Sequence, residues 1–560
     1  QQGTYQQDSA TAKLQGDVVI TSSNGIEVRG QGFELRRGGH VVASTKSPVH
    51  FSYKDQFSGR SRELAAHMRR RWYQLAGNVR ISNGLTGEAA SSLEAKKLVY
   101  EEKEQLIVAE TEVLLKRGSD QIRARRLSVT LDEAGRSMRF VSARWGVSGD
   151  RASYGGAPGS GLHFEGDQAS VRFSETTGEM ESAVIDGGDG GPAILDLLEV
   201  GGVVRRMTTP HLSIGFRGGE LASSEAEGPV LIRDFLPFDD DNPLASGCAN
   251  DAVASFDSTG ELDRLVLNGE VDLHRPGFQA SGNKAEAAGD GSEIQLTGAP
   301  AKVYTRSGEF DAPRITYDPG RGSGKATGGV RALLPGEGDF ALLAEAQPED
   351  EPIHLTADKA SWTDDGAFTF EGAVRAWQNE NFLVTDRLIG GRSGRELTAK
   401  GRVKTVIKQA AEDRVVEDEE DGAQAPVEVT ATELLYDADR QTLHYTGRPR
   451  AHQGGSSLTC DDLDVFLGAE SKLEELVCKG GAQIENPDQG HIVTGDKAVY
   501  RPETASVEVT GRPVVLTDTA GGKIRGGTVL YDLETGTARV QSGLSSEGPS
   551  SDTEESGEDT

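Results

Sequence analysis

Residues that could perform chemistry are few in this chain, and none has the spacing of a known catalytic or metal-binding motif. The 560 residues include ten histidines and three cysteines, without a His-Glu-x-x-His, Cys-x-x-Cys or paired-histidine spacing. The glycine-rich stretch at 187–191 is not followed by Gly-Lys-Ser/Thr or a helical pattern, which favours a turn over a phosphate-binding loop. The sequence therefore predicts no catalytic residue, no cofactor and no metal, and a protein that is not an enzyme.

Charged clusters offer other candidate sites. Three consecutive aspartates at 239–241 could supply oxygen ligands to a hard cation, but they lack alternating spacing, so a solvated acidic loop is favoured. Arginines at 69–71 and 123–126 could contact phosphates or an acidic partner, and the alternative is a solvated strand face. The formal charge of −30 argues against nucleic acid as a partner.

Two of the cysteines could form a cross-strand pair. Cys460 and Cys478 would lie opposite each other in a hairpin centred on Ala469. The pair is either a disulfide or two buried thiols, and three cysteines in all exclude a disulfide-rich scaffold.

The elements that carry these residues are predicted to be β-strands. Short alternations of apolar and polar residues, each ending in turn-forming residues, recur along the chain, which contains 71 glycines. The segment 60–77 has helical propensity but fits two strands around a tight turn equally well. No run of eighteen apolar residues occurs, so no membrane-spanning helix is expected.

A short phrase, apolar-x-x-Gly-x-Val or Pro, repeats in the second half of the chain. Its glycines are separated by 29, 46, 33, 31 and 32 residues; they are Gly372, Gly401, Gly447, Gly480, Gly511 and Gly543. A unit of roughly 30 residues cannot bury its own apolar face, so such units stack on one another. The predicted fold is all-β: an elongated stack of two facing sheets.

The alternation assigns apolar side chains to the interior of this stack. The candidate lining residues are Leu443, Tyr445, Leu476, Ile484, Val507, Val509 and Val515, with each group placed on one strand face around its glycine. These faces contain few large residues, so two facing sheets could leave a trough for apolar chains. A closed core filled by its own side chains fits the same pattern, and composition does not choose between the two.

Two stretches resemble a known family. TATELLYDADRQTLHYTGRPR and HIVTGDKAVYRPETASVEVTGRPVVLTDTAGGKIRGGTVLYDLETG are similar to the OstA-like family, which comprises the periplasmic LptA and LptC proteins and the N-terminal part of LptD in lipopolysaccharide transport. The resemblance implies an open, twisted β-jellyroll with a V-shaped cross-section, whose apolar groove carries acyl chains. It also implies a periplasmic location and partners that join through edge strands: other Lpt-type β-jellyroll proteins of the inner-membrane transporter complex and the outer-membrane assembly protein.

We expect six segments along the chain. They are a disordered N-terminus (1–12), an OstA/LptC-like jellyroll (13–149), an irregular β segment with long loops (150–260), further jellyroll repeats (261–354), OstA/LptA-like repeats with an acidic loop at 411–426 (355–545), and a disordered acidic tail (546–560). The first residue is Gln1 rather than Met, which indicates that a signal peptide or an inner-membrane anchor preceded it.

The function predicted from these features is a non-enzymatic periplasmic bridge that shields the acyl chains of lipopolysaccharide, or a related lipid, between the inner and outer membranes. Two alternatives remain open from the sequence. One is a polysaccharide-acting or adhesive surface β-solenoid, built from parallel coils. The other is a structural scaffold with a closed core.

Overall fold

The structure is a computed structural model that divides into two compact units, Gln1–Ile294 (unit 1) and Gln295–Thr560 (unit 2). It describes residues 2–7, 10–54, 56–83, 90–151, 160–199, 201–237, 239, 241–335, 352–378, 381–391, 396–407, 426–437, 439–468, 473–533, 535–542 and 545–547. Within these ranges nearly all regular structure is β-strand, so the predicted all-β fold is confirmed. None of the helices in these ranges has the length and apolarity needed to span a membrane.

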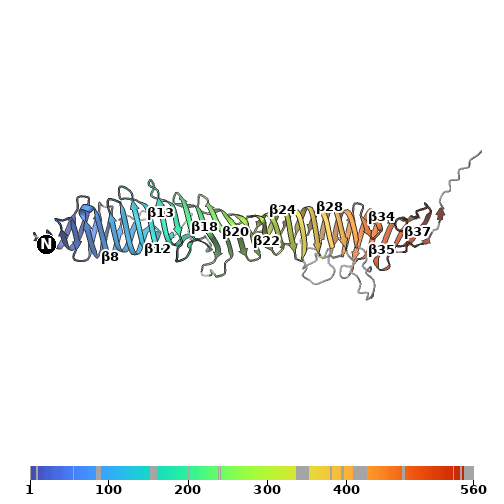
Figure 1. Cartoon of the computed structure of the whole chain (residues 1–560), viewed down its shortest axis with the longest axis horizontal. Helices are drawn as coiled ribbons and strands as arrows, with labels where there is room; N and C mark the ends of the chain where they lie inside the picture. Colours follow the sequence, from blue (N-terminus) through green and yellow to red (C-terminus); the bar gives the residue numbers. More distant parts are fainter. Residues whose placement is uncertain are drawn as a thin grey trace, which may run out of the picture. The chain divides into compact units, whose positions relative to one another are not determined.

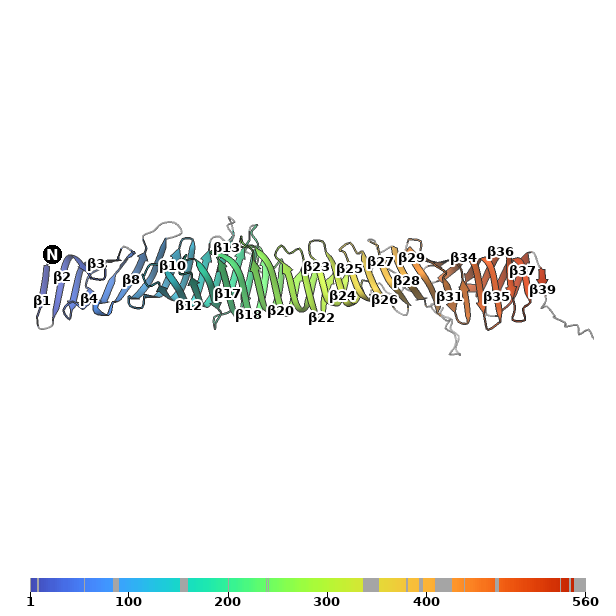
Figure 2. The same cartoon turned by 90° about the horizontal axis from the view of Figure 1, so that it is seen from above.

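Unit 1 is a ladder of antiparallel strands, drawn in blue to green in Figures 1 and 2. Its elements are β1 (Gln2–Gln6), β2 (Thr11–Thr21), β3 (Ile26–Arg36), β4 (Val41–Ser44), β5 (Val49–Tyr53), β6 (Phe57–Ser61), β7 (Glu63–His67), η1 (Met68–Arg70), β8 (Trp72–Ser82), β9 (Ser91–Glu101), β10 (Leu106–Arg117), β11 (Asp120–Leu131), β12 (Met138–Arg151), β13 (Gly161–Phe173), β14 (Met180–Asp186), β15 (Ala193–Leu198), β16 (Val204–Thr209), β17 (His211–Arg217), β18 (Glu220–Phe235), β19 (Ala245–Phe256), β20 (Leu262–Arg275) and β21 (Phe278–Ala288). Most long strands pair with the next one in the chain, and shorter strands pair with a strand two or three further on, as β3 does with β5 and β4 with β7.

Unit 2 repeats this antiparallel pattern (Figure 1). Its elements are β22 (Ile294–Thr305), β23 (Gly308–Asp318), β24 (Ser323–Leu334), β25 (Ile353–Trp362), β26 (Phe368–Gln378), β27 (Asn381–Gly390), β28 (Glu396–Ile407), β29 (Val427–Asp437), β30 (Thr442–Thr446), β31 (Arg450–Gln453), β32 (Ser456–Thr459), β33 (Asp462–Leu467), β34 (Leu473–Asn486), β35 (His491–Arg501), η4 (Pro502–Thr504), β36 (Ser506–Thr517), β37 (Lys523–Asp532), β38 (Ala538–Ser542) and β39 (Ser545–Glu547).

Most full-length strands contain a β-bulge near the middle, where the pairing register shifts. In β28 the shift falls between Lys400 and Val403, and in β26 it falls between Glu371 and Val374. A bulge bends the strand, so its two halves contribute to two different sheets. Other strands are divided at the bend, as when β29 pairs with β30 through one half and with β31 through the other. The two halves therefore build two sheets that face each other.

At the bend of β28, glycine is favoured for a backbone reason and a packing reason. Gly401 has a φ of +100°, which side-chain-bearing residues rarely adopt, and a Cβ atom there would collide with the carboxylate of Asp386. That carboxylate accepts a hydrogen bond from the backbone N–H of Arg402 at 3.0 Å. The hydrogen bond to the Arg402 side chain lowers the pKa of Asp386, so the carboxylate stays ionised at the bend.

The segment boundaries differ from those expected. Residues 2–6, expected to be disordered, form β1 and pair with β2, and the segment 150–260 carries regular strands from β13 to β19. The boundary between the two compact units falls at 294/295, within the expected repeat segment 261–354. The ambiguous segment 60–77 folds as strands around the short turn η1. Most of the acidic loop, the tail beyond 547 and Gly543 lie outside the described residues.

Candidate functional site

The apolar interior of unit 2 is lined by rows of side chains that pair across neighbouring strands. Two rows run along one sheet: Tyr445, Leu463, Cys478, Ala498, Val509 and Val529 form the first, and Leu443, Val465, Leu476, Tyr500, Val507 and Tyr531 form the second. All twelve side chains are buried. In each half-strand, alternate side chains point to the interior. The inward side chains of neighbouring half-strands then form a continuous apolar wall.

A third row lies on the opposite sheet and faces the first two. Its buried members are Ala451, Leu458, Ile484, Val493 and Leu516. A cavity of about 40 Å³ separates the sheets, and its walls include Ile484 from this row and Leu476 and Val507 from the facing sheet. Three of the predicted lining residues, Leu476, Ile484 and Val507, are therefore brought together around one apolar space.

Side-chain hydrogen bonds cross the interior between the two sheets. The Tyr445 hydroxyl and the Thr405 hydroxyl are 2.8 Å apart and both side chains are buried, while the Tyr500 hydroxyl donates to the side-chain oxygen of Gln453 at 2.9 Å. Burial raises the pKa of Tyr445, and its hydrogen bond to Thr405 only partly opposes this. Tyr445 is therefore neutral, and the interior presents no charge at this level.

One predicted lining residue was assigned to the wrong face. In β36, Thr510 pairs with Thr528 and Val514 pairs with Gly526. Four residues along β36 therefore correspond to two residues along β37. The inward-facing positions on the two sides of the bend, Val509 and Val514, are an odd number of steps apart, so the alternation reverses there; Val514 is fully buried and Val515 lies on the outward face. The other six predicted residues are buried in the interior.

Cys460 and Cys478 are joined by a disulfide with a Cα–Cα distance of 5.8 Å, but the expected hairpin register was wrong. Cys478 pairs directly with Leu463, whereas Cys460 precedes β33 at the corner where the chain passes from one sheet to the other. The backbone N–H of Asp461 donates to the carbonyl of Gly480 at 2.9 Å and holds this corner against β34. Ala469, the expected hairpin centre, lies outside the described residues.

The arginine clusters predicted from the sequence are not combined into one patch. Arg69 and Arg70 belong to η1 and the neighbouring Arg71 pairs with Glu102 at 3.5 Å, whereas Arg123 lies three strands away on β11. Of the three consecutive aspartates, Asp239 accepts a hydrogen bond from Asn242 at 2.9 Å, and residue 240 lies outside the described ranges.

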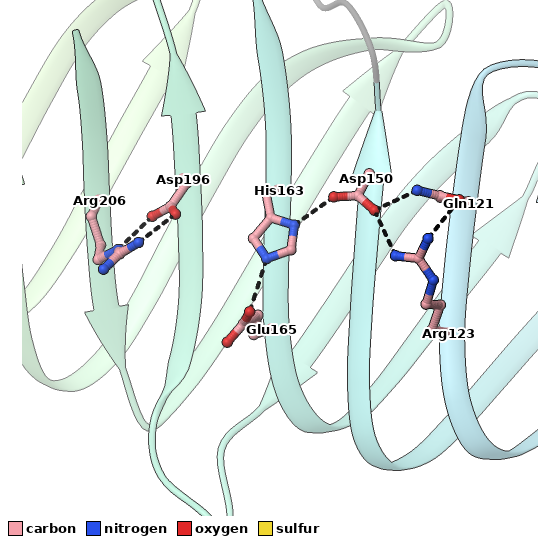
Figure 3. A network of polar contacts seen from close by, with 7 residues as sticks. All are labelled: Gln121, Arg123, Asp150, His163, Glu165, Asp196 and Arg206. Atoms are coloured by element: carbon pink, nitrogen blue, oxygen red, sulfur yellow. Dashed lines mark hydrogen bonds and ion pairs between the residues drawn. The ribbon is translucent and has the colours of Figure 1, made fainter. Parts of the chain in front are cut away.

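Arg123 belongs instead to a polar network on β11, β12 and β13 (Figure 3). Asp150 accepts from the side chains of Gln121 and Arg123 and contacts the His163 ring at 2.6 Å; the other ring nitrogen of His163 lies 3.0 Å from Glu165. Burial lowers the pKa of His163, but the hydrogen bonds to the two carboxylates outweigh it, and the net pKa is raised. Burial raises the pKa of Asp150, but its hydrogen bonds to His163 and Gln121 produce a net decrease.

Thr405 is an interior polar residue that sequence reasoning missed. It is separated from Tyr445 by 40 residues, and it continues the alternation of β28 after the bulge. The only sequence signal is a polar residue at an inward position of an otherwise apolar half-strand, between Val403 and Ile407.

The fold and the interior together define the class of protein: an antiparallel β-jellyroll whose two facing sheets bury continuous apolar rows. Residues 428–537, which contain most of these rows, match the family described as "LptA/(LptD N-terminal domain) LPS transport protein". This match confirms the resemblance to the OstA-like family.

Solved structures also resemble parts of the chain. One is LptH of Pseudomonas aeruginosa, titled the LptA homologous periplasmic component of a lipopolysaccharide transport device; it is 16% identical, with 22% of this chain and 94% of that chain covered and a TM-score of 0.20. A comparison with curated proteins found no match.

Proposed function

We propose that the chain is a non-enzymatic periplasmic bridge that carries lipopolysaccharide, or a related lipid, from the inner to the outer membrane. The acyl chains are shielded between the two facing sheets of unit 2. The observation that carries this proposal is the coincidence of two features: residues 428–537 match a lipopolysaccharide-transport family, and the same residues supply the facing apolar rows. Shielding contributes about 0.8 kcal/mol for each buried methylene group, so long chains favour the interior strongly.

Entry of an acyl chain requires the sheets to separate. The cavity of about 40 Å³ between them is close to the roughly 30 Å³ that one water molecule occupies in the liquid. A chain of many methylene groups therefore displaces the rows of one sheet from those of the other, with the bulged bends acting as the hinge. The hydrogen bond between Tyr445 and Thr405 crosses this opening and is broken when the sheets part at that level.

Partners join this bridge through its edge strands. Among the described residues, β1 pairs with β2 alone and β39 pairs with β37 alone, so each leaves one edge free of a partner strand. A strand edge of another Lpt-type β-jellyroll protein can add to either one by main-chain hydrogen bonds. The partners proposed are the inner-membrane transporter complex and the outer-membrane assembly protein.

Of the alternatives, the parallel β-solenoid is wrong as an architecture, because every strand pair described in the structure is antiparallel. The closed-core scaffold is favoured by one observation, the small volume of the cavity. It differs from the bridge in that its interior never admits lipid.

Photocrosslinking separates these two functions. A photoreactive residue is placed at Ile484 or Val507, whose side chains line the cavity, and the protein is illuminated with purified lipopolysaccharide. The matched control positions are Glu508 and Arg512, whose side chains point outward from β36, the strand that contains Val507. The bridge predicts lipid adducts at the two interior positions. Adducts confined to the outward positions, or none at all, would support the closed core.

A further inference from the structure

A row of three arginines and one histidine crosses the outward face of β3, β5, β6 and β8, which are strands of the blue part of Figure 2. Arg29 on β3 is directly opposite His50 on β5, His50 is opposite Arg60 on β6, and Arg60 is opposite Arg80 on β8. All four residues are exposed. We call this set, Arg29, His50, Arg60 and Arg80, the arginine row.

The row is electrostatically unfavourable without a counter-anion. Arg60 and Arg80 are like charges placed directly opposite each other, an arrangement that destabilises a sheet. The terminal members are partly compensated, since Arg29 pairs with Glu27 and Arg80 pairs with Glu94 at 3.3 Å. Among the described residues, no carboxylate lies within ion-pair distance of Arg60. The centre of the row is therefore a guanidinium without an anionic partner from the described part of the chain.

The charge of this segment differs from that of the whole chain. Residues 26–82 contain eleven Lys and Arg against four Asp and Glu, a formal charge of +7, whereas the chain as a whole carries −30. A basic segment in a strongly acidic protein attracts anionic ligands to that segment rather than to the rest of the surface. This charge contrast is independent of the strand register that forms the row.

A row of hydroxyl groups lies beside the arginine row. Ser52 is opposite Ser58, Ser58 is opposite Ser82, and Ser82 is opposite Ser92. Both rows line one surface hollow of about 600 Å³, a volume typical of small-ligand sites. Guanidinium groups bind phosphate oxygens with two parallel hydrogen bonds, and hydroxyl groups supply further donors, so the hollow has the donors that a phosphate requires.

The opposite face of the same strands is apolar. Val28, Phe51 and Ile81 line a cavity of about 30 Å³ in the interior of unit 1. His50 is only three residues from Tyr53, the last residue of β5 and another wall of this cavity, a distance of about 10 Å along the strand. A lipid whose acyl chains enter here can pass over the strand ends and place its headgroup on the outward face.

We propose that the arginine row binds the phosphate of an acyl lipid headgroup while the acyl chains of that lipid occupy the interior of unit 1. This inference rests on the proposed function and adds to it a recognition site for the headgroup, in a unit that the family match does not cover. Arg60 is the central ligand, and the serine row holds the adjoining oxygens.

Calorimetric titration of the full chain tests this assignment with three probes. They are dihexanoyl phosphatidate, dihexanoylglycerol and inorganic phosphate, which separate the headgroup, the acyl chains and the free anion. We expect phosphatidate to bind about tenfold or more tightly than either other probe, because a charge-assisted contact is added to the acyl contacts. Comparable affinity for dihexanoylglycerol or for inorganic phosphate would overturn the proposal, as would no binding of phosphatidate.

Variants locate the site. Arg60→Gln is expected to weaken phosphatidate binding about tenfold, and Glu94→Gln to strengthen it, because Arg80 loses its competing carboxylate. Arg172→Gln removes the same charge from an exposed strand position of unit 1 outside the hollow, and should have no effect. Equal losses in the Arg60 and Arg172 variants would overturn the proposal in favour of a general charge effect. Crosslinking at Ile484 and Val507 is unaffected by this result, so the two proposals fail separately.

Discussion

The hydrogen bond between Tyr445 and Thr405 gives the most direct test that two sheets face each other across the interior. The two hydroxyl oxygens are 2.8 Å apart, and the side chains are 0% and 1% exposed. Tyr445→Phe leaves the Thr405 hydroxyl buried without this partner, and Thr405→Val does the same to the Tyr445 hydroxyl. Each change is expected to cost about 1–3 kcal/mol of unfolding free energy.

The double variant shows whether the two hydroxyl groups interact. When both hydroxyls are replaced by apolar groups of similar shape, no donor or acceptor remains unpaired, so the loss is far smaller than the sum of the single losses. The predicted coupling free energy is about 1–3 kcal/mol in the double-mutant cycle.

Urea unfolding of the full chain provides the assay. The fluorescence of Trp362 and Trp377, both in unit 2, reports the transition when Trp72 and Trp145 of unit 1 are replaced by phenylalanine. Additive losses, within about 0.3–0.5 kcal/mol, would mean that the two hydroxyls do not interact, and would refute the arrangement of facing sheets at this level.

Three further predictions concern the bends, the alternation and the outer network. Gly401→Ala should cost about 2–3 kcal/mol of unfolding free energy, because its φ is positive and its Cβ meets a carboxylate, whereas Gly481→Ala, with open space around it, should cost about 1 kcal/mol. Val514→Thr should cost about 1–3 kcal/mol and Val515→Thr no more than about 0.5 kcal/mol in the same urea assay. Since the pKa of His163 is raised on folding, its stabilisation is complete below about pH 6.5 and is lost as the pH rises through the folded-state pKa, so His163→Gln should lower the melting temperature more at about pH 5.5 than at about pH 8.

Each of these three has an outcome that contradicts it. Equal costs at the two glycines would remove the role of the carboxylate contact. A larger loss of unfolding free energy for Val515→Thr than for Val514→Thr would mean that the alternation of β36 continues unbroken across the bend. A melting-temperature difference for the His163 variant that is constant with pH would show that the ring contributes by packing alone.

The resemblance to the OstA-like family could be recognised from short sequence motifs. These motifs contain the apolar and polar alternation of single strands, which is a local property of the sequence. Leu443 and Tyr445 alternate within one short strand, so their burial on one face follows from the two-residue period of β-structure. The glycine before Arg402 could likewise be located, since its phrase recurs in the sequence. None of these inferences required knowledge of which strands pair.

The assignments that failed depended on the register at the bends. Val515 was placed inside because alternation was carried through Gly511 and Pro513, and the register shift at that point reversed it. Cys460 was placed opposite Cys478 because a simple hairpin was assumed, whereas the chain turns a corner between the two sheets before β33 begins. A bulge changes the count of residues without a distinct composition, so alternation alone does not reveal it.

By itself, then, the sequence determined that the chain forms short alternating strands, that these stack into an apolar two-sheet interior, and that one region resembles lipopolysaccharide-transport proteins. Only the tertiary structure decided which side chains face each other. Arg29 and Arg80 are 51 residues apart in the sequence, yet belong to one row because β3, β5, β6 and β8 pair in succession. The reason is physical: strand periodicity is local, whereas cross-strand register arises from contacts between residues distant along the chain.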